Sequence, residues 1–420
     1  MGFVRKTPAG TYRACWRDPA GKQRSKSFPT KREASRFLAE IESAKNRGLY
    51  VDPHAGRIKL RDYAATWMSG RNVERTTSAA SASIIRTHVL PRWGSVPLGK
   101  IDHSAVQQWI TELSAKRSPA TVRKCYHTLS AILRLAVRDR LIAYNPCDGI
   151  QLPPLRRTDK DERIISREAF TQQLLPAIPP RHHALVALAG GTGLRWGECV
   201  GLRWDAVDLD NAEVHVIRVA IEVAGTVMVK PFPKSRAGRR TVPLPPFVVQ
   251  ALKDHRTRYG EGPAGEVFTN DAGGPVRRTL FRARVWRPAL VRAGLLGKVI
   301  QEGREQYKAT WRNSADREQS RIFDSEREAI AETARHAAGG LRFHDLRHSY
   351  ATWLVSDGVP VNDVQRIMGH EQATTTLNLY THSSGTLSER VRRTFDAFSL
   401  PQEDHQPGRD GEPAGGPKWT

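Results

Sequence analysis

Two polar, proline-containing stretches interrupt this chain, and they constrain its fold more than any other feature. The first covers residues 50–57, and the second begins at Pro153-Pro154 and continues through the charged run 156–163. Such stretches favour exposed linkers between separately folded parts. The 420 residues are enough for two or three domains with cores of their own. We therefore predict parts at 1–55, 59–152 and 163–400, and a disordered, Pro- and Gly-rich tail at 401–420.

The first part has the pattern of a small β-sheet with a helix. Strand-like stretches at 11–16 and 23–28 flank a turn signal at 18–22, which predicts a hairpin, and an amphipathic helix follows from its cap residue Thr30. Residues 1–60 hold 14 Lys or Arg against 5 Asp or Glu. This excess favours a DNA-binding face over a merely solvated basic surface. The candidate contacts are Arg13, Trp16, Arg17, Arg24 and Lys26.

The second part is predicted to be all-α. Apolar residues at helical spacing indicate helices near 63–68, 80–89, 104–113 and 118–136. In the last of these, Ser118 is the expected N-cap and Pro119 the first helical residue, and the helix should stop before Asn145-Pro146. Arg123 and Lys124 are candidate DNA contacts on this helix. A basic outer surface suits a DNA clamp and an ordinary soluble surface equally well.

The third part is predicted to be a mainly helical α+β domain. Residues 213–222, 223–230 and 241–244 have the pattern of strands. Residues 297–340 are highly charged and poor in large apolar residues, so we expect an insertion that is helical in part. The sequence assigns this insertion no role, and we expect no internal repeat in the chain.

The net charge of +23 and the pI near 10.3 indicate a polyanionic partner. Basic side chains release counterions from nucleic-acid phosphates, which drives sequence-independent binding. A membrane surface is the competing polyanion, but the chain has no long apolar run, secretory segment or lipidation signal. The four cysteines lack the spacing of a disulfide framework. We therefore expect a soluble, cytoplasmic protein with reduced thiols.

Four short motifs in the third part together suggest chemistry on a DNA phosphate. They are Gly193-Leu194-Arg195-Trp196-Gly197-Glu198, His344-Asp345-Leu346-Arg347, Gly369-His370 and Leu379-Tyr380-Thr381-His382. Cleaving a DNA backbone without a metal requires a nucleophile, cations that hold the charge of the phosphate oxygens, and an acid for the leaving oxygen. Arginine suits the second task because its guanidinium group contacts two oxygens and stays charged.

Each motif alone has an ordinary structural alternative. Arg195 follows the run 190–193, so we expect it on the first turn of a helix after a Gly-rich loop, although it could be a plain surface arginine. His344 and Arg347 lie three residues apart in a helical pattern and so share a face. Gly369 is expected to cap a helix, and His370 to follow it. A lone Tyr380 in a helix is more often a core residue than a nucleophile.

The spacing of two histidines also suggests a possible metal site. His344 and His348 are four residues apart, as in the helix motif of zinc proteases. The usual acid of that motif is Glu, whereas this chain has Asp345, and Arg347 would place a cation inside the site. Because no clear third ligand follows, we predict no metal.

The order Arg195, Lys234, His344-x-x-Arg347, His370 and Tyr380 resembles that of the tyrosine recombinases, and in particular of phage-type integrases. The flanking residues at 192–204, 233–244, 367–370 and 374–382 fit the same family. The resemblance covers nearly the whole chain. Residues 1–50 resemble the arm-site DNA-binding module of these integrases, and residues 60–150 resemble their helical core-binding domain.

The resemblance implies a site-specific recombinase that integrates, and with a partner excises, a phage or other mobile element. Tyr380 would form a 3′-phosphotyrosyl link, which conserves the energy of the phosphodiester, so no ATP, metal or other cofactor is implied. Arg195 and Arg347 would clamp the phosphate. His344 would take the proton of the tyrosine, and His370 would donate a further hydrogen bond. Lys234 would protonate the leaving oxygen, with Lys230 and Arg236 nearby. Glu198 would orient neighbouring side chains.

The implied partners are double-stranded DNA with core- and arm-type attachment sites, three further copies of the chain in a tetramer, a host DNA-bending factor and an excision factor. A type IB topoisomerase shares the chemistry but has no need for a second DNA-binding module. A non-catalytic DNA-binding relative is the alternative from a different class. The complete set of motif residues favours the recombinase over both.

Overall fold

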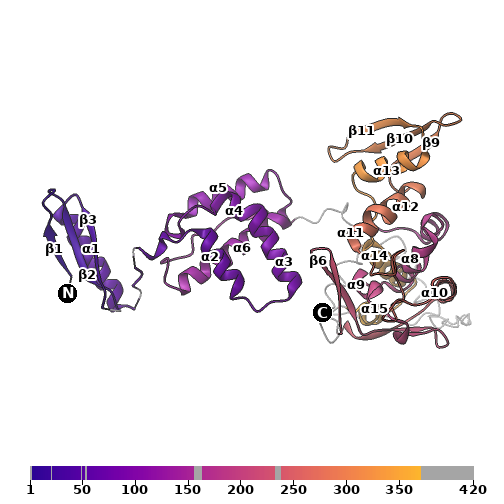
Figure 1. Ribbon diagram of the computed structural model, residues 1–420, viewed down its shortest axis with the longest axis horizontal. Helices are drawn as coiled ribbons and strands as arrows, with labels where there is room; N and C mark the ends of the chain where they lie inside the picture. The colour runs from indigo at the N-terminus through magenta and orange to yellow at the C-terminus, as the bar shows by residue number, and fades with distance from the viewer. Residues whose placement is uncertain are drawn as a thin grey trace, which may run out of the picture. The chain divides into compact units, whose positions relative to one another are not determined.

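The computed structural model describes residues 2–369 apart from residues 20, 49, 53, 156–162 and 232–237. The chain divides into two compact units, residues 1–161 with 221–228, and residues 162–220 with 229–420. Figure 1 labels helices and strands of the chain and colours them in sequence order. Several predictions fall on residues outside those described. They concern Lys234, Arg236, His370, Tyr380 and the tail at 401–420.

The N-terminal module is an antiparallel sheet covered by one helix. Its elements are β1 (Phe3–Lys6), β2 (Tyr12–Arg17), β3 (Gln23–Phe28) and α1 (Lys31–Asn46), with the strands in the order β1-β2-β3. The predicted hairpin and the cap at Thr30, whose side chain accepts from the Glu33 N–H, are both confirmed. The sequence did not predict β1, because its four residues contain too few apolar positions to show alternation.

The helical domain of the first unit packs around one apolar core. Its elements are η1 (Ala55–Arg57), α2 (Leu60–Ser69), α3 (Arg75–Ile84), η2 (Ile85–Val89), α4 (Leu90–Trp93), η3 (Leu98–Lys100), α5 (His103–Ser114) and α6 (Pro119–Arg138). Ser118 caps α6, with Pro119 in its first turn, as predicted. The core centres on α6, whose buried face includes Leu129, Ile132 and Leu133.

The second unit is the mainly helical α+β region. Its helices are η5 (Ala169–Leu174), α7 (Leu175–Ala177), α8 (Pro180–Thr192), α9 (Trp196–Val200), η6 (Trp204–Ala206), α10 (Pro246–Tyr259), α11 (Arg278–Phe281), η8 (Arg282–Trp286), α12 (Arg287–Arg292), α13 (Glu326–His336), α14 (Asp345–Ser356) and α15 (Val361–Met368). Helix α8 is buried from Ala184 to its end and contacts α9, α10 and α14, so it forms the centre of this unit.

The strands before α10 lie in two small sheets. They are β4 (Val207–Asp208), β5 (Glu213–Val216) and β8 (Arg240–Pro243), in the order β4-β5-β8, and the hairpin β6 (Val219–Val223) with β7 (Thr226–Lys230). The prediction of one strand over 213–222 was wrong, because β5 pairs with β8 and the chain then leaves that sheet before β6. The turn at Ala224-Gly225, where both residues have positive φ, closes the hairpin.

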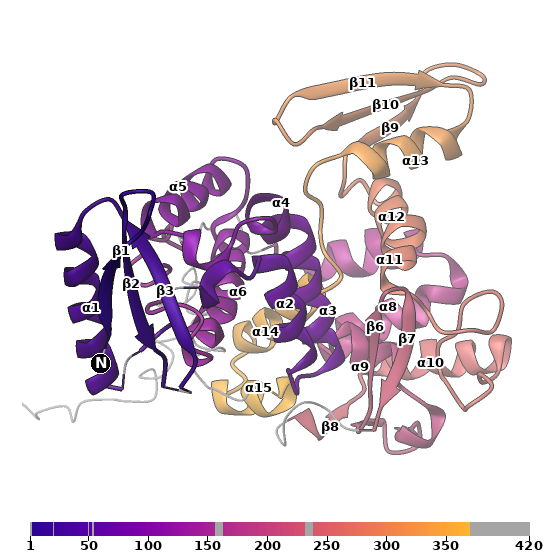
Figure 2. The same ribbon diagram turned by 60° about the vertical axis from the view of Figure 1, so that its left-hand side comes forward.

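The insertion at 297–340 is mostly sheet. It contains β9 (Lys298–Gln301), β10 (Tyr307–Arg312) and β11 (Glu318–Phe323), in the order β11-β10-β9, followed by helix α13. The expected helix is therefore confirmed. The prediction of no internal repeat was wrong, because this unit has the strand order and helix of the N-terminal module (Figure 2).

None of the helices in the described ranges combines the length and the apolar character needed to cross a membrane. All four cysteines are free and buried.

Candidate active site

Arg195 lies between two helices at the centre of the second unit. Helix α8 ends at Thr192, Gly193 adopts a left-handed conformation with φ of 62°, and Arg195 is the N-cap residue of α9. The predicted Gly-rich loop before Arg195 was wrong, because Gly190 and Gly191 belong to α8. Packing requires glycine at both positions. A Cβ on Gly190 would lie 2.2 Å from the Phe170 ring, and a Cβ on Gly191 would lie 2.4 Å from Val248.

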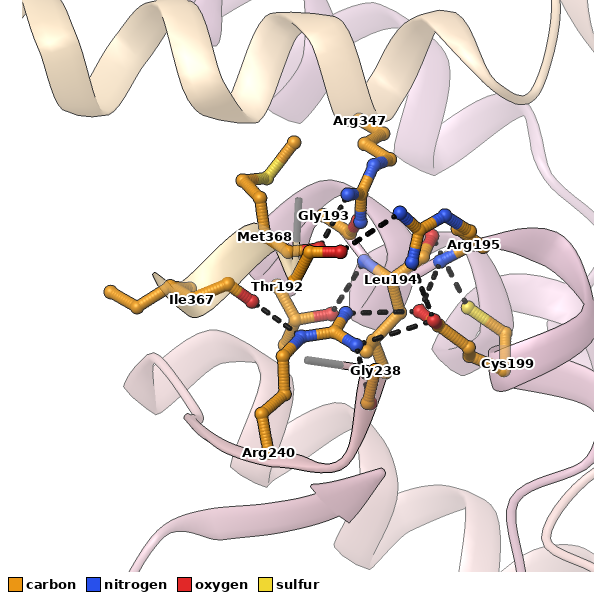
Figure 3. Close-up of polar contacts among 12 residues, drawn as sticks. Thr192, Gly193, Leu194, Arg195, Cys199, Gly238, Arg240, Arg347, Ile367 and Met368 are labelled. Atoms are coloured by element: carbon orange, nitrogen blue, oxygen red, sulfur yellow. Dashed lines mark hydrogen bonds and ion pairs between the residues drawn. The ribbon is translucent and has the colours of Figure 1, made fainter. Parts of the chain in front are cut away.

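A buried carboxylate, Glu198, holds two arginines at this point. Its Oε1 accepts from Arg195 Nη1 at 2.9 Å and from Arg240 Nη1 at 3.2 Å. Its Oε2 accepts from the Arg195 backbone N–H at 2.9 Å and from Arg240 Nη2 at 3.0 Å. Figure 3 shows the Arg195 and Arg240 guanidinium groups converging from opposite sides. No role was predicted for Arg240, which is the first residue of β8 and follows the basic residue Arg239.

The pKa of Glu198 follows from these contacts. Burial raises it, but the hydrogen bonds and positive charge of Arg240, with the charge of Arg195, outweigh burial and lower the pKa to about 2. The carboxylate is therefore ionised throughout the physiological range. It fixes the two guanidinium groups as charged donors.

Arg347 joins three segments that are distant in the sequence. Its side chain leaves the first turn of α14 and is only 3% exposed. Nη1 donates to the Gly193 carbonyl at 2.7 Å, and Nη2 donates to the Met368 carbonyl (Figure 3). Arg347 thereby ties the end of α8 to the end of α15.

Arg195 reaches the same end of α15. Its Nη2 donates to the Gly369 carbonyl at 3.2 Å, while its side chain remains 40% exposed. Gly369 caps α15 with φ of 63°, as predicted. Arg240 also donates, through Nε, to the Ile367 carbonyl. The structure thus gathers Arg195, Arg240 and Arg347 around residues 367–369, which immediately precede His370. Such a concentration of guanidinium groups favours binding of an oxyanion.

His344 lies at the start of α14, next to Arg347. An aromatic cluster supports the preceding residue, Phe343, which packs edge-on against Trp196 with ring centroids 4.9 Å apart. The residue as a whole is exposed, but its ring is partly desolvated. This desolvation lowers the pKa of His344 to about 4, and the nearby charges of His348, Arg347 and Arg195 act in the same direction. His344 is therefore neutral at pH 7 and able to accept a proton.

Two other potential nucleophiles in the centre are suppressed by burial. Tyr350 on α14 is 8% exposed, and burial raises the pKa of its hydroxyl to about 12. Burial likewise raises the pKa of the Cys199 thiol, which lies within α9. Neither group is poised to attack a phosphate at neutral pH.

The predicted DNA contacts of the N-terminal module divide between its two faces. Arg13 and Arg17 alternate with Ala14 and Trp16 along β2, so they lie on the sheet face away from α1. Trp16 must be removed from the set. It is 2% exposed, packs against Phe37 and donates to the Tyr50 hydroxyl at 2.9 Å.

The other two candidates of this module lie on its helix side. Arg24 pairs with Asp52 at 2.7 Å, and the Lys26 ammonium lies over the Phe37 ring at 4.9 Å. In the helical domain, Lys124 is exposed on α6, whereas Arg123 is half-buried and donates to the Pro153 carbonyl at 3.1 Å. Of these candidates, Arg17, Lys26 and Lys124 are exposed, and Arg13, Arg24 and Arg123 are half-buried.

Among the described residues, no group of three or more His, Cys, Asp or Glu side chains could hold a metal ion. The His344 and His348 rings meet edge-on with centroids 5.0 Å apart. Asp345, the acidic residue between these two histidines in the sequence, is fully buried and accepts from Arg342 Nη2 at 2.8 Å.

Comparison with known proteins gives a consistent set of relatives. A protein named as a prophage phiRv2 integrase of Mycobacterium tuberculosis is 26% identical over 412 residues, which cover 96% of this chain and 97% of the relative. A XerC-like tyrosine recombinase of Caldanaerobacter subterraneus is 26% identical over 393 residues, covering 87% of this chain and 90% of the relative.

Solved structures show the same fold. The Tn1549 transposon integrase, in complex with circular intermediate DNA, has a TM-score of 0.57 at 21% identity and covers 80% of this chain and all of its own length. A lambda integrase dimer bound to a COC′ core site has a TM-score of 0.50 at 16% identity, covering 90% of this chain and 93% of its own.

Two family models match the sequence. The model of the phage integrase central domain matches residues 60–151, and the model of the phage integrase family matches residues 167–386, more than half of the chain. The comparisons favour neither a DNA-relaxing enzyme nor a non-catalytic DNA-binding protein. The chain therefore belongs to the phage integrase family of tyrosine recombinases, whose function is site-specific DNA recombination.

Proposed function

We propose that this chain is a catalytically active integrase that cleaves and rejoins double-stranded DNA through Tyr380. The Tyr380 oxygen attacks the scissile phosphorus, the bond to the 5′ oxygen breaks, and a 3′-phosphotyrosyl link remains. Attack by a 5′ hydroxyl of another strand reverses the step and releases the tyrosine. The phosphodiester energy is kept in the covalent link, so the reaction needs no ATP.

The observation that carries this proposal is the convergence of Arg195 and Arg347 on the end of α15. Both guanidinium groups donate to carbonyls of residues 368–369. A phosphate next to these groups would have its nonbridging oxygens stabilised by charge-assisted hydrogen bonds. The next residue, His370, would add a further donor. Glu198 and Arg240 are positioning residues here, because Glu198 bonds Arg195 and Arg240 to each other.

Two groups handle the protons. The Tyr380 hydroxyl must lose its proton as it attacks, and a neutral His344 can accept it. The leaving 5′ oxygen must gain a proton, and we assign its donation to Lys234, which lies between β7 and β8 in the sequence. Lys230, the last residue of β7, is the alternative described donor.

The substrate follows from the modules that accompany the centre. We propose that the helical domain binds core sites, through surfaces that include Arg123 and Lys124, and that the N-terminal module binds arm sites. Exchange of two duplexes requires four strand cleavages with one tyrosine each, so the working assembly is a tetramer. Integration of a mobile element and its excision would further require a DNA-bending host factor and an excision factor. Its DNA substrate places its action in the cytoplasm.

The direct test uses attachment-site DNA, identified as a direct repeat that flanks the element. Wild-type protein mixed with a nicked version of this duplex should give an adduct that survives denaturant. Tyr380→Phe should give none, while Tyr350→Phe, which alters a buried tyrosine of the same centre, should retain it. An adduct with Tyr380→Phe would refute the assignment of the nucleophile.

A further inference from the structure

Residues 297–336 repeat the sequence of residues 2–41 at a constant spacing of 295 residues. Without any gap, 13 of the 40 aligned positions are identical. They include the aromatic residues that build the module, because Tyr12, Trp16 and Phe28 correspond to Tyr307, Trp311 and Phe323. A spacing that stays constant through three strands and two turns requires that every loop has the same length in both segments.

The two segments also share their strand register. In each, the third residue of the segment pairs with the thirteenth, as Val4 with Ala14 and Val299 with Ala309. The second hairpin pairs Trp16 with Arg24, and Trp311 with Gln319. The turn bonds match as well, since the Gly21 N–H donates to Asp18 and the Asp316 N–H to Asn313, both at 2.9 Å.

The interiors correspond position by position. A Cβ on Gly2 would meet Leu38, Cys15 and Trp16, and a Cβ on Gly297 would meet their counterparts Thr333, Thr310 and Trp311. Lys26 lies over the Phe37 ring at 4.9 Å, and the counterpart pair, Arg321 with Glu332, forms an ion pair at 2.8 Å. The second segment is thus a second copy of the N-terminal module with a changed core.

Hydrogen bonds from helix α12 connect the second copy to the rest of the second unit. Arg287 is 8% exposed and donates to three carbonyls at the end of α13, among them Ala337 at 2.6 Å and Gly339 at 3.2 Å. The Trp286 N–H donates to the Leu341 carbonyl at 2.7 Å. The copy therefore leaves and rejoins the unit at nearly the same place, and its sheet projects away from α12 (Figure 2).

The sheet face away from the helix keeps cations where the first copy has them. Lys308 and Arg312 occupy the positions of Arg13 and Arg17 on the central strand. The segment 297–336 as a whole holds eight basic and eight acidic residues. Its acidic residues lie mainly in the turns and on α13. Glu318 is the acidic residue carried by this face of the strands, and Glu302, in the turn after β9, pairs with Lys308 at 3.0 Å.

The same face carries exposed apolar residues beside these cations. Ile300 and Ile322 pair across the strands with Lys308 and are 39% and 58% exposed. A sheet can enter the major groove of DNA, where basic side chains contact phosphates and guanines and apolar side chains contact thymine methyl groups. Arg5 and Ser27 hold the two apolar positions in the first copy, so the two faces differ in chemistry.

We propose that residues 297–336 form a second sheet-type DNA-binding module, which contacts duplex DNA through the face of Lys308, Arg312, Ile300 and Ile322. The proposal rests on the proposed function, because it assigns to the second copy the DNA-binding role proposed for the first. A single protomer would then carry two modules of one ancestry with different sequence preferences.

The two copies offer matched positions for a cross-linking test in the full-length protein. Ser25 and Ser320 are identical, exposed and centred on the corresponding sheet faces, and Glu33 and Glu328 are identical, exposed and on the helices. The native cysteines are buried, so Ser25→Cys, Ser320→Cys, Glu33→Cys and Glu328→Cys can each be labelled selectively with a benzophenone. Each protein is then irradiated with a duplex pool of random sequence, with unsubstituted protein as background.

The proposal predicts cross-links to DNA from Ser25→Cys and Ser320→Cys and only background from the two helix positions. It further predicts that Lys308→Ala with Arg312→Ala lowers the slope of log K against log salt by about 2, and that Lys308→Arg with Arg312→Lys restores it. Cross-links from Ser25→Cys without any from Ser320→Cys would overturn it. So would cross-links from Glu328→Cys instead, because the α12–α13 side would then hold the DNA.

A different result would show that the proposed function itself is wrong. In that case the wild-type protein would form no covalent adduct with nicked attachment-site DNA, whatever the cross-linking result. A wild-type protein that forms the adduct, together with a silent Ser320→Cys, would refute only the second module.

Discussion

The candidate active site and the two sheet modules both present arginines, but they hold them in opposite ways. In the centre, Glu198 and Arg347 are 4% and 3% exposed, and each bonds to several partners. On the module faces, Arg17 and Arg312 are exposed, and the side chain of each bonds to the turn of its own hairpin, Arg17 to the Gly21 carbonyl and Arg312 to Asp316. Buried charges must be paired and are fixed in geometry, whereas exposed charges are mobile and screened by salt.

This difference separates the two tasks of a recombinase. A reacting phosphate needs donors held within tenths of an ångström, and a buried network provides that precision. Attachment to a long duplex needs many weak contacts that can form and break, and exposed cations provide those. Substitutions in the centre should therefore have large effects that do not depend on salt. Substitutions on the modules should have small effects that do.

The largest effect is expected for Arg347→Lys. A lysine keeps the charge but cannot donate from two planar nitrogens to Gly193 and Met368 together, so the α8–α15 junction should lose its geometry. We expect the rate of adduct formation to fall about 10²- to 10³-fold. Single-turnover cleavage measures it, with Arg366→Lys, an exposed position 82% accessible, as the control. If Arg347→Lys lost no more activity than Arg366→Lys, the buried arginine would be no more important for cleavage than an exposed one, which would contradict the contrast drawn above.

The next effect concerns stability. Glu198→Gln removes the charge between Arg195 and Arg240 and leaves the buried Arg240 without its ion pair, so we expect a loss of about 3 kcal/mol in the free energy of unfolding. The exposed pair of Asp205 and Arg218, at 2.7 Å, is the matched control, and Asp205→Asn should lose less than about 1 kcal/mol. Urea denaturation measures both. Equal losses would contradict the distinction between buried and exposed pairs.

The stability of the protein should depend on pH through the titratable groups of the site. The pKa of Glu198 is lowered to about 2, so its contribution to stability is fully present above the unfolded value of 4.5 and is lost as the pH falls towards 2. The pKa of His344 is lowered to about 4, so the unfolded chain binds the proton first, and stability also falls with pH between 6.5 and 4.

Histidine NMR tests the second part of this prediction. Signals that disappear in His344→Gln identify the residue, and they should titrate near pH 4. A midpoint at 6.5 would show that neither desolvation of the ring nor the neighbouring charges of His348, Arg347 and Arg195 lower its pKa. Because burial also lowers the pKa of His182, His183 and His255, acid denaturation alone would not isolate His344.

The smallest effect is expected on the module faces. Arg17→Ala and Arg312→Ala each remove an exposed side chain, so the free energy of unfolding should change by less than about 0.5 kcal/mol. Binding to a random duplex should weaken at low salt and converge with that of the wild type at high salt. A loss of stability comparable to that of Glu198→Gln would show that these arginines are structural.

Much of the fold follows from local signals. The cap at Ser118 with Pro119, the hairpin at 18–22 and the glycine cap at Gly369 were each predicted, because they depend on a few neighbouring residues. The order of the site motifs was also sufficient to indicate the family. The break between β5 and β6 was missed, because a continuous apolar pattern does not reveal that β5 pairs with a strand more than 20 residues away.

The structure brings together Arg195, Glu198 and Arg347, which the sequence had singled out, but their hydrogen bonds could not be predicted. Gly190 and Gly191 look like a loop in the sequence, and only the packing of Phe170 and Val248 against them explains why they lie in a helix. Arg240 lies in the stretch 233–244 that fits the family but was assigned no role, and its importance comes from the buried Glu198 that it contacts. The repeat at 297–336 was missed because its identities are spread thinly, and they acquire meaning once the strand registers are compared.

The measurement that tests the account most directly is the chemical identity of the covalent link. Protein trapped on nicked attachment-site DNA is digested with nuclease and protease, and the peptide that carries a nucleotide is sequenced by mass spectrometry. We predict a single modified residue, Tyr380, joined to a 3′ phosphate. A nucleotide on Tyr350, on a histidine, or joined through a 5′ phosphate would contradict it.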